Sequence, residues 1–297
     1  MARSLTLILL CFTIVQTAMA GGPWPRKKNS GYAQLGFTYV GYSKFFNHEG
    51  KVTELPRAVT DFTSQVYIDY GLTDRLTMTA NLPFKYVATG KNVLTSDPSY
   101  FTDTTIFRDT ISQNSLFGLS NVMLGFKYNI INKKVLFSAG LNAEANVAKY
   151  DSLSTLRTGP STFVIHPYLS TGGSFYKGKF YTLLDLGYRV RLKDYSDEID
   201  FNFELGFTWN QKTYFIANVA GRIPVGDGSY NNNSSVQFPN GRDLQTSLYP
   251  NNQQYLGYGL KFIQKIKKVH INAGVYFGMG KMVAATPSYN LGLAYEW

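Results

Sequence analysis

A two-residue alternation of apolar and polar side chains constrains this chain more than any other feature. In residues 199–209, every second side chain from Ile199 to Trp209 is apolar, and the side chains between them are polar or absent. This period is that of a β-strand, because successive side chains of a strand point to opposite faces. Twelve such segments occur, at residues 31–42, 60–70, 75–87, 116–129, 134–148, 162–176, 179–192, 199–210, 212–224, 253–266, 268–282 and 287–297.

The lengths of these segments and of their connections favour a membrane barrel over a soluble sandwich. A soluble strand averages about five or six residues, whereas a tilted strand that crosses a membrane needs about nine to eleven. Short turns at 71–74, 131–133, 176–178, 210–211 and 267–268 alternate with longer connections at 43–59, 88–115, 149–161, 193–198, 225–252 and 283–286. Five short turns and six longer loops place both termini on the short-turn side, which is the arrangement of outer-membrane barrels.

The need to pair every backbone hydrogen-bonding group inside a membrane supports the same fold class. No apolar run reaches the roughly 18 residues that a membrane-spanning helix needs. Inside lipid every backbone donor and acceptor must be paired within the protein, so strands can cross only as a closed barrel. The 22 Tyr, 21 Phe and 3 Trp residues are then expected to form aromatic girdles at the two membrane interfaces. We therefore expect an all-β, closed antiparallel transmembrane β-barrel of about 12 strands.

Residues 1–20 have the features of a secretory signal peptide. Arg3 supplies the positive charge, residues 5–15 form the apolar stretch, and Ala18 and Ala20 form a small-x-small cleavage site. The apolar stretch is too short to span a membrane. The barrel domain is then residues 21–297, in the outer membrane of a Gram-negative bacterium. Cys11 is the only cysteine, so the mature chain has neither disulfides nor thiol chemistry.

The formal net charge of +10 raises the alternative of a nucleic-acid-binding protein. A secretory signal argues against a nucleic-acid partner. The basic residues are also mostly isolated, apart from clusters at 26–28, 133–134 and 265–268. These clusters fall at the mature N-terminus or in predicted turns, so we expect them to be solvated ends that face one aqueous side.

Charged residues of the polar strand faces are expected to point into the lumen, because a charge on the lipid face costs about 2–4 kcal/mol near the midplane. They form a polar conduit in one interpretation, and a salt-bridged plug that fills the lumen in the other. The candidate lumen-lining residues for selectivity are Asp185, Arg189, Arg191, Asp200, Glu204, Arg222, Asp69, Arg75, Lys127 and Glu144. Asp61, Lys85, Lys261 and Glu296 are expected to face inward as well.

Catalytic and metal-binding motifs are absent from the sequence. Of the three histidines, His48 falls in a predicted loop, His270 lies beside a predicted turn, and His166 faces inward next to Pro167. A lipase-type site needs a serine and an acid or amide beside one histidine, and spacing nominates no such partner. We expect no enzyme activity, no metal and no cofactor. Pro83 and Pro167 interrupt predicted strands, where each removes a ladder donor.

The C-terminus resembles the signal that outer-membrane barrels present to their assembly machinery. Aromatic or apolar residues alternate up to the last position, at Tyr289, Leu291, Leu293, Tyr295 and Trp297. The resemblance implies that the barrel-assembly machinery is a partner.

Two further stretches resemble a known family. Residues 70–76, Tyr-Gly-Leu-Thr-Asp-Arg-Leu, followed by Asn-Leu-Pro-Phe at 81–84, are similar to a strand-turn-strand signature. Residues 118–128 are similar to a second signature, with Ser120-Asn121 in place of Gly-Asp. Both belong to the phenol meta-pathway degradation-like family of outer-membrane β-barrels. The resemblance implies a barrel distantly similar to transporters of hydrophobic compounds and fatty acids. It carries over neither catalytic residues nor phenol as the substrate.

We therefore expect a porin-like, transporter-like channel that gives a small solute a passive or gated route through a charged lumen. The partners would be outer-membrane lipid, an unknown small solute and other outer-membrane proteins. The rivals are a structural accessory barrel of a secretion or assembly complex, a membrane-edge hydrolase that would depend on His166, and a soluble secreted β-protein. The loop candidates for the accessory barrel's contact patch are Tyr100, Phe101, Ile106, Phe107, Leu244, Leu248 and Tyr249.

Overall fold

The computed structural model describes residues 22–90, 93–94, 110–210, 212–226, 228, 235–237, 243–245, 249 and 251–297. The predicted signal peptide lies outside the described residues. So do five of the patch candidates, Tyr100, Phe101, Ile106, Phe107 and Leu248. No helix long and apolar enough to span a membrane occurs in the described ranges.

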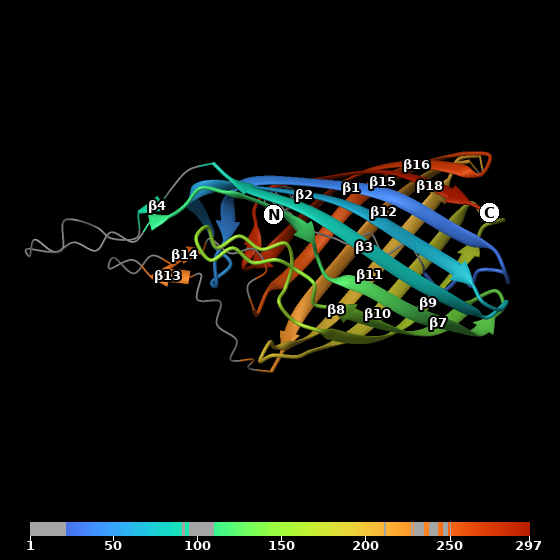
Figure 1. Ribbon diagram of the computed structural model, residues 1–297. Helices are drawn as coiled ribbons and strands as arrows, with labels where there is room; N and C mark the ends of the chain where they lie inside the picture. The colour runs from blue at the N-terminus through green and yellow to red at the C-terminus, as the bar shows by residue number, and fades with distance from the viewer. Residues whose placement is uncertain are drawn as a thin grey trace, which may run out of the picture.

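Twelve long antiparallel strands form a sheet that closes on itself, so the predicted fold class is confirmed (Figure 1). Closure comes from β1, which pairs with β2 on one side and with β18 on the other. Two short strands complete the sheet, because β6 (Ser115–Leu119) precedes β7 along β3 and β17 (Val283–Ala284) pairs with β1. The long strands are β1 (Gly31–Phe46), β2 (Val52–Gly71), β3 (Leu76–Thr89), β7 (Val122–Asn132), β8 (Leu136–Ala145), β9 (Val164–Phe175), β10 (Phe180–Arg191), β11 (Asp197–Thr208), β12 (Thr213–Val225), β15 (Gln254–Ile266), β16 (Val269–Lys281) and β18 (Ser288–Glu296).

The two ends of the barrel differ in their connections. The short turns and the C-terminus lie at one end, on the right in Figure 1. The long connections lie at the other end and carry two small hairpins, which are drawn beyond the barrel in Figure 1. These hairpins are β4 (Val93–Leu94) with β5 (Thr110–Ile111) and β13 (Ser235–Gln237) with β14 (Asp243–Gln245). We refer to the two ends as the short-turn end and the loop end.

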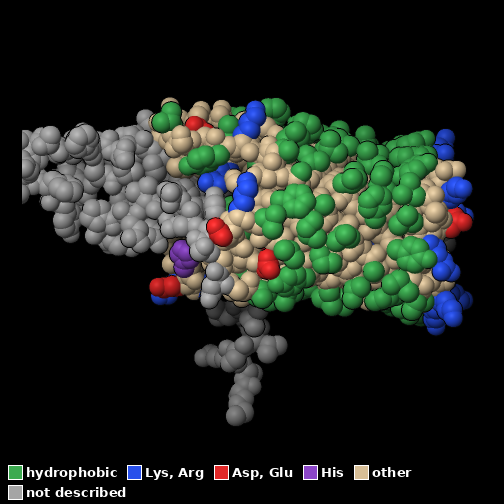
Figure 2. All heavy atoms as spheres, turned by 60° about the horizontal axis from the view of Figure 1, so that its bottom comes forward, with side chains coloured by type: hydrophobic (Ala, Val, Ile, Leu, Met, Phe, Trp, Pro, Cys, Tyr) green, Lys and Arg blue, Asp and Glu red, His purple; other side chains and the backbone are tan. Residues whose placement is uncertain are grey.

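The alternation in the sequence becomes an apolar outer wall and a polar interior. Leu186 and Phe203 point outward, with 50% and 40% of their surface exposed, whereas Asp185 and Asn202, the residues that precede them in the chain, are buried. Apolar side chains consequently cover the barrel wall in Figure 2. Near the short-turn end, neighbouring aromatic rings form a band that we call the aromatic belt, made of Tyr176, Phe180, Phe207, Trp209, Tyr295 and Trp297.

The prolines that interrupt the predicted strands lie where the ladders are irregular. Along β3, pairing passes from β7 to β6 between Asn81 and Phe84, so Pro83 lies at the break and its carbonyl accepts the N–H of Ser120 at 2.9 Å. Pro167 pairs with β8, but the ladder between β9 and β10 skips the positions around it. Each proline therefore lies where one ladder lacks a regular pair, as its missing N–H requires.

The predicted loop at 43–59 is wrong in extent. β1 and β2 continue beyond the predicted boundaries as a hairpin that turns at residues 47–51. The pairing changes register between Tyr42 and Lys44, which breaks the simple alternation there. Because the alternation is irregular here, the prediction from the two-residue period missed the outer parts of both strands.

Candidate functional site: the barrel lumen

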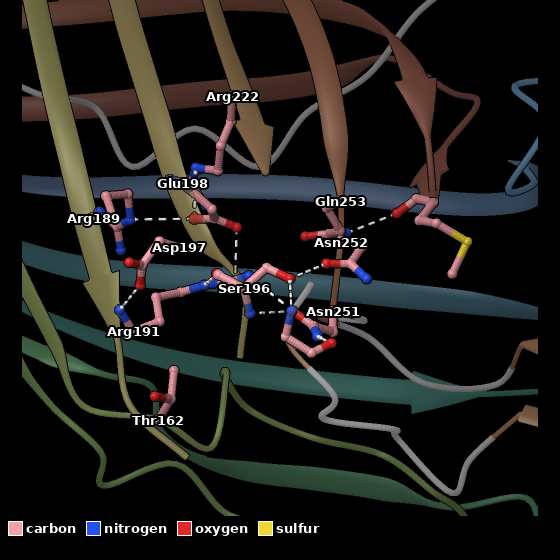
Figure 3. Close-up of polar contacts among 12 residues, drawn as sticks. Thr162, Arg189, Arg191, Ser196, Asp197, Glu198, Arg222, Asn251, Asn252 and Gln253 are labelled. Carbon is pink, nitrogen blue, oxygen red and sulfur yellow. Dashed lines mark hydrogen bonds and ion pairs between the residues drawn. The ribbon is translucent and has the colours of Figure 1, made fainter. Parts of the chain in front are cut away.

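An ion-pair network occupies the part of the lumen toward the loop end (Figure 3). Glu198 of β11 is buried and lies at its centre. Its carboxylate is 2.9 Å from Arg191 Nη1, 3.4 Å from Arg189 Nε and 3.3 Å from Arg222 Nε. Arg189 also donates to Glu144 Oε1 at 2.6 Å. Strands β8, β10, β11 and β12 belong to the consecutive run β8–β9–β10–β11–β12 of the sheet, so the inward parity of each brings these side chains together.

Two further groups extend this network. Asp200 lies beside His166, with Oδ1 and Nε2 separated by 3.0 Å. The guanidinium of Arg222 stands over the ring of Tyr255, 5.5 Å from its centroid. Three arginines thus face three carboxylates, those of Glu144, Glu198 and Asp200, so the network is formally balanced. Charges buried in this way are tolerated only when each is paired.

The middle of the lumen is lined by amides and hydroxyls around two carboxylates. Asp185 accepts hydrogen bonds from the Ser170 hydroxyl and, at 3.2 Å, from the Asn202 amide. Glu204 accepts from the Tyr181 hydroxyl at 3.3 Å. These groups can offer both donors and acceptors to a polar solute.

The residues that precede β1 cross the lumen at the short-turn end, and we call residues 22–30 the N-terminal strap. The carbonyl of Gly22 accepts from Lys127 Nζ at 2.6 Å, and that of Pro23 accepts from Ser138 Oγ at 2.8 Å. Trp24 packs edge-on against Tyr181 of β10, with ring centroids 5.6 Å apart. In the closed order of the barrel β10 is the seventh strand counted from β1, so the strap reaches the opposite wall.

Charge fixes the strap at Arg26, and close approach to the wall fixes it at Gly22. Arg26 donates to Glu296 Oε1 at 2.9 Å and lies 3.8 Å from Asp69. A Cβ on Gly22, whose φ is +43°, would lie 2.2 Å from a methyl carbon of Leu183. Gly22 therefore lies where a larger side chain would collide with the barrel wall.

An apolar cluster occupies the lumen at the loop end. Leu156, from the connection between β8 and β9, is fully buried against Val59 and Val87, which point inward from β2 and β3. Arg57 fastens this connection, because its Nη2 donates to the carbonyl of Ser154 at 2.6 Å. The carboxylate of Asp151 accepts hydrogen bonds from the backbone N–H groups of Leu153 and Ser154 in the same connection. Hydrogen bonds from the Ser154 hydroxyl and the Asn114 amide hold the pKa of Asp151 below its usual range.

A second part of the chain, Tyr249 and residues 251–253 before β15, also covers the loop end. Tyr249 packs on the apolar cluster, and its hydroxyl lies 3.4 Å from Asp61, which pairs with Lys85 at 2.6 Å. Burial raises the pKa of the Tyr249 phenol well above its usual range, so it stays a donor. Asn251 accepts from Arg191 Nη2 and from the Ser196 backbone, each at 3.0 Å (Figure 3).

Nine of the ten candidate residues from the sequence lie in three groups. The structure brings Glu144, Arg189, Arg191, Asp200 and Arg222 into one network. It places Asp185 and Glu204 in the middle of the lumen, and Asp69 and Lys127 beside the strap. The prediction for Arg75 is wrong, because β3 begins at Leu76 and leaves Arg75 exposed in the turn.

Several important residues were missed. Glu198 falls in a predicted loop, although Asp197–Thr208 is a strand. Arg57 falls in the predicted loop at 43–59, and Leu156 in the one at 149–161. His166 faces inward as predicted, but its hydrogen-bond partners are Asn142 and Asp200. No serine hydroxyl contacts it in the part of the chain that the structure describes.

The described residues thus form a closed antiparallel β-barrel with an apolar outer wall and a polar interior. Neither a family model nor a curated protein matches the sequence. The structure is similar to that of the COG4313 outer membrane channel from Pseudomonas putida F1, with a TM-score of 0.67, 11% identity, and coverage of 93% of this chain and 98% of that chain. It is also similar to the β domain of the Bordetella autotransporter BrkA, with a TM-score of 0.50, 10% identity, and coverage of 91% and 100%. These similarities show the fold.

Proposed function

We propose that the protein lies in the outer membrane of a Gram-negative bacterium and gives a small polar solute a gated route through its charged lumen. The short-turn end faces the periplasm in this proposal, because outer-membrane barrels place their short turns there. The observation that carries the proposal is a polar lumen with segments from outside the barrel wall lying across each end. The strap lies across one end, and residues 149–158 lie across the other together with Tyr249 and residues 251–253.

These covers can move without breaking the barrel. Residues 22–26 of the strap are attached through backbone carbonyls, one aromatic contact, the Arg26 side chain and the hydrogen bond from the Arg26 backbone to Thr77, whereas Asn29 and Ser30 pair with Gly71 of β2. The charges that the covers enclose are balanced, which favours a neutral or zwitterionic solute over a simple ion. The channel description of the P. putida structure supports a conduit, and the resemblance of residues 70–76 and 118–128 supports the phenol meta-pathway degradation-like family.

Single-channel recording in a planar bilayer tests the proposal. The refolded wild type is expected to show discrete openings with weak ion selectivity. An Arg189→Ala, Arg191→Ala variant leaves Glu144, Glu198 and Asp200 in excess, so its openings are expected to become cation-selective. A Lys44→Ala, Lys51→Ala variant removes the same charge from the exposed β1–β2 hairpin and is expected to keep the wild-type selectivity. Equal selectivity in all three proteins would place the arginines off the path.

A structural barrel with an occluded lumen is the second candidate. Inward side chains such as Asn129, Ser138 and Ser170 are at most 1% exposed, so the interior is closely filled in this conformation. A folded barrel that stays silent in the bilayer, both as wild type and after the strap is loosened, would favour this accessory role. A membrane-edge hydrolase finds less support, because His166 lacks a hydroxyl nucleophile among its described partners.

A further inference from the structure

The short-turn end carries an unbalanced positive charge, which the conduit does not use. Three of its five turns expose two basic side chains each. The pairs are Lys133 with Lys134, Lys177 with Lys179, and Lys267 with Lys268. We call the exposed Lys and Arg side chains of the five turns the basic rim. Every turn contributes to it, through Arg75, Lys133, Lys177, Lys212 and Lys267.

The basic rim has almost no acidic counterpart. In the described part of these turns, Asp74 is the one carboxylate, and it accepts the backbone N–H of Lys28 at 3.0 Å. No ion pair among the described residues involves a side chain of the rim. Figure 2 shows Lys and Arg side chains gathered at the barrel end away from the loops.

The loop end has a different surface. Its exposed charges carry both signs, and two of its lysines are paired, since Lys44 lies 3.8 Å from Glu54 and Lys51 lies 2.7 Å from Glu49. A general need for solubility would place such charges at both ends alike. Among the described residues, the exposed surface with basic side chains and almost no carboxylates therefore lies on one side of the membrane.

The aromatic belt indicates where the basic rim lies relative to the lipid headgroups. Tyr176 and Trp209 are 74% and 72% exposed, and Tyr176 directly precedes Lys177. Trp and Tyr rings of this kind lie at the level of the lipid headgroups. Lysine stems beside them can lie along apolar surface while their ammonium groups reach the headgroup phosphates.

We propose that the basic rim binds anionic phospholipid headgroups in the leaflet at the short-turn end. The inference rests on the membrane placement in the proposed function, but not on conduction. The five turns surround the whole circumference, where a ring of lipid meets the wall. The phosphate of each lipid would lie among the lysines, and its acyl chains would pack on the apolar wall beyond the aromatic belt.

Native mass spectrometry of the full mature protein from mixed micelles tests the proposal. The micelles contain equal amounts of phosphatidylglycerol and phosphatidylcholine. We expect the wild type to retain the anionic lipid at least about ten-fold over the neutral one, because each Lys near an anionic surface adds a several-fold preference. At about 0.5 M NaCl the preference is expected to disappear without any substitution, because salt screens exposed charges.

Two matched variants locate the effect. The rim variant, Lys133→Gln, Lys177→Gln, Lys212→Gln, Lys267→Gln and Lys268→Gln, is expected to lose the preference. The loop-end variant removes five exposed lysines at the other end and is expected to keep it. Its substitutions are Lys44→Gln, Lys51→Gln, Lys149→Gln, Lys193→Gln and Lys281→Gln.

Equal retention of the two lipids by the wild type at low salt would overturn the proposal, as would equal losses in the two variants. If the rim binds a soluble acidic partner instead of lipid, the wild type would retain the two lipids equally. A heat-dependent shift on a gel shows separately that each variant is folded. Conductance is recorded on the same preparations, so a silent lumen and a rim without lipid preference are distinguishable.

Discussion

At the scale of single residues, Glu198 has the largest expected effect on stability. Its carboxylate is shared by Arg189, Arg191 and Arg222 and is only 1% exposed. The change Glu198→Gln leaves these guanidinium groups without their common counter-charge. Removing one partner of a buried ion pair costs about 3–5 kcal/mol. We expect a loss of that size in the free energy of unfolding, measured by urea titration of the protein folded into vesicles.

A matched carboxylate at the surface provides the control. Glu54 pairs with Lys44, and both side chains are more than half exposed. Exposed pairs contribute about 0–1 kcal/mol, so Glu54→Gln should change stability little. Equal losses in the two variants would show that the shared position of Glu198 does not matter.

The network also shows what residue parity could and could not predict. Asp185, Arg189 and Asp200 were placed inside because each alternates with outward apolar side chains. Parity alone cannot show that Arg189 and Glu144 lie 2.6 Å apart, because that depends on strand register. Glu198 was missed because the prediction began its strand at Ile199, and strand ends are the least periodic part of the pattern.

At the scale of elements, the N-terminal strap has no periodic signal, so the sequence did not predict its path. It contains Pro23 and Pro25, which lack a backbone N–H and so leave fewer donors to satisfy away from a ladder. Its path is visible only in the structure, where Lys127 and Ser138 of the wall donate hydrogen bonds to its carbonyls. The strands, in contrast, follow directly from the alternation.

The strap should act as a gate that its side-chain contacts hold shut. Trp24→Ala removes the edge-on contact with Tyr181, and such aromatic pairs contribute about 0.5–1.5 kcal/mol. We therefore expect the ratio of open to closed time to rise by about two- to ten-fold in single-channel recordings. Trp209→Ala removes an exposed ring of the aromatic belt and should leave this ratio unchanged. If both variants gate alike, or neither differs from the wild type, the strap is not the gate.

At the scale of the whole molecule, the barrel depends on its last strand. β18 is the only long strand between β16 and β1, and it pairs with both along most of its length. Of the lipid-facing residues that resemble an assembly signal, those from Tyr289 to Tyr295 belong to this strand, and Trp297 directly follows its end. Closure could be predicted from the sequence because an open sheet edge in lipid leaves backbone groups without partners.

Breaking this seam at one position should therefore prevent the whole barrel from forming. Leu293 pairs with Leu35 on β1 and with Ile271 on β16, far from the irregular positions that accommodate Pro83 and Pro167. Leu293→Pro removes a ladder donor and leaves a carbonyl without a partner, which costs several kcal/mol in lipid. We expect no heat-modifiable, urea-resistant species on a gel. Leu293→Ala keeps the N–H and should still fold, with lower stability. A folded Leu293→Pro barrel would mean that β18 tolerates a bulge, and that closure does not rest on an unbroken seam.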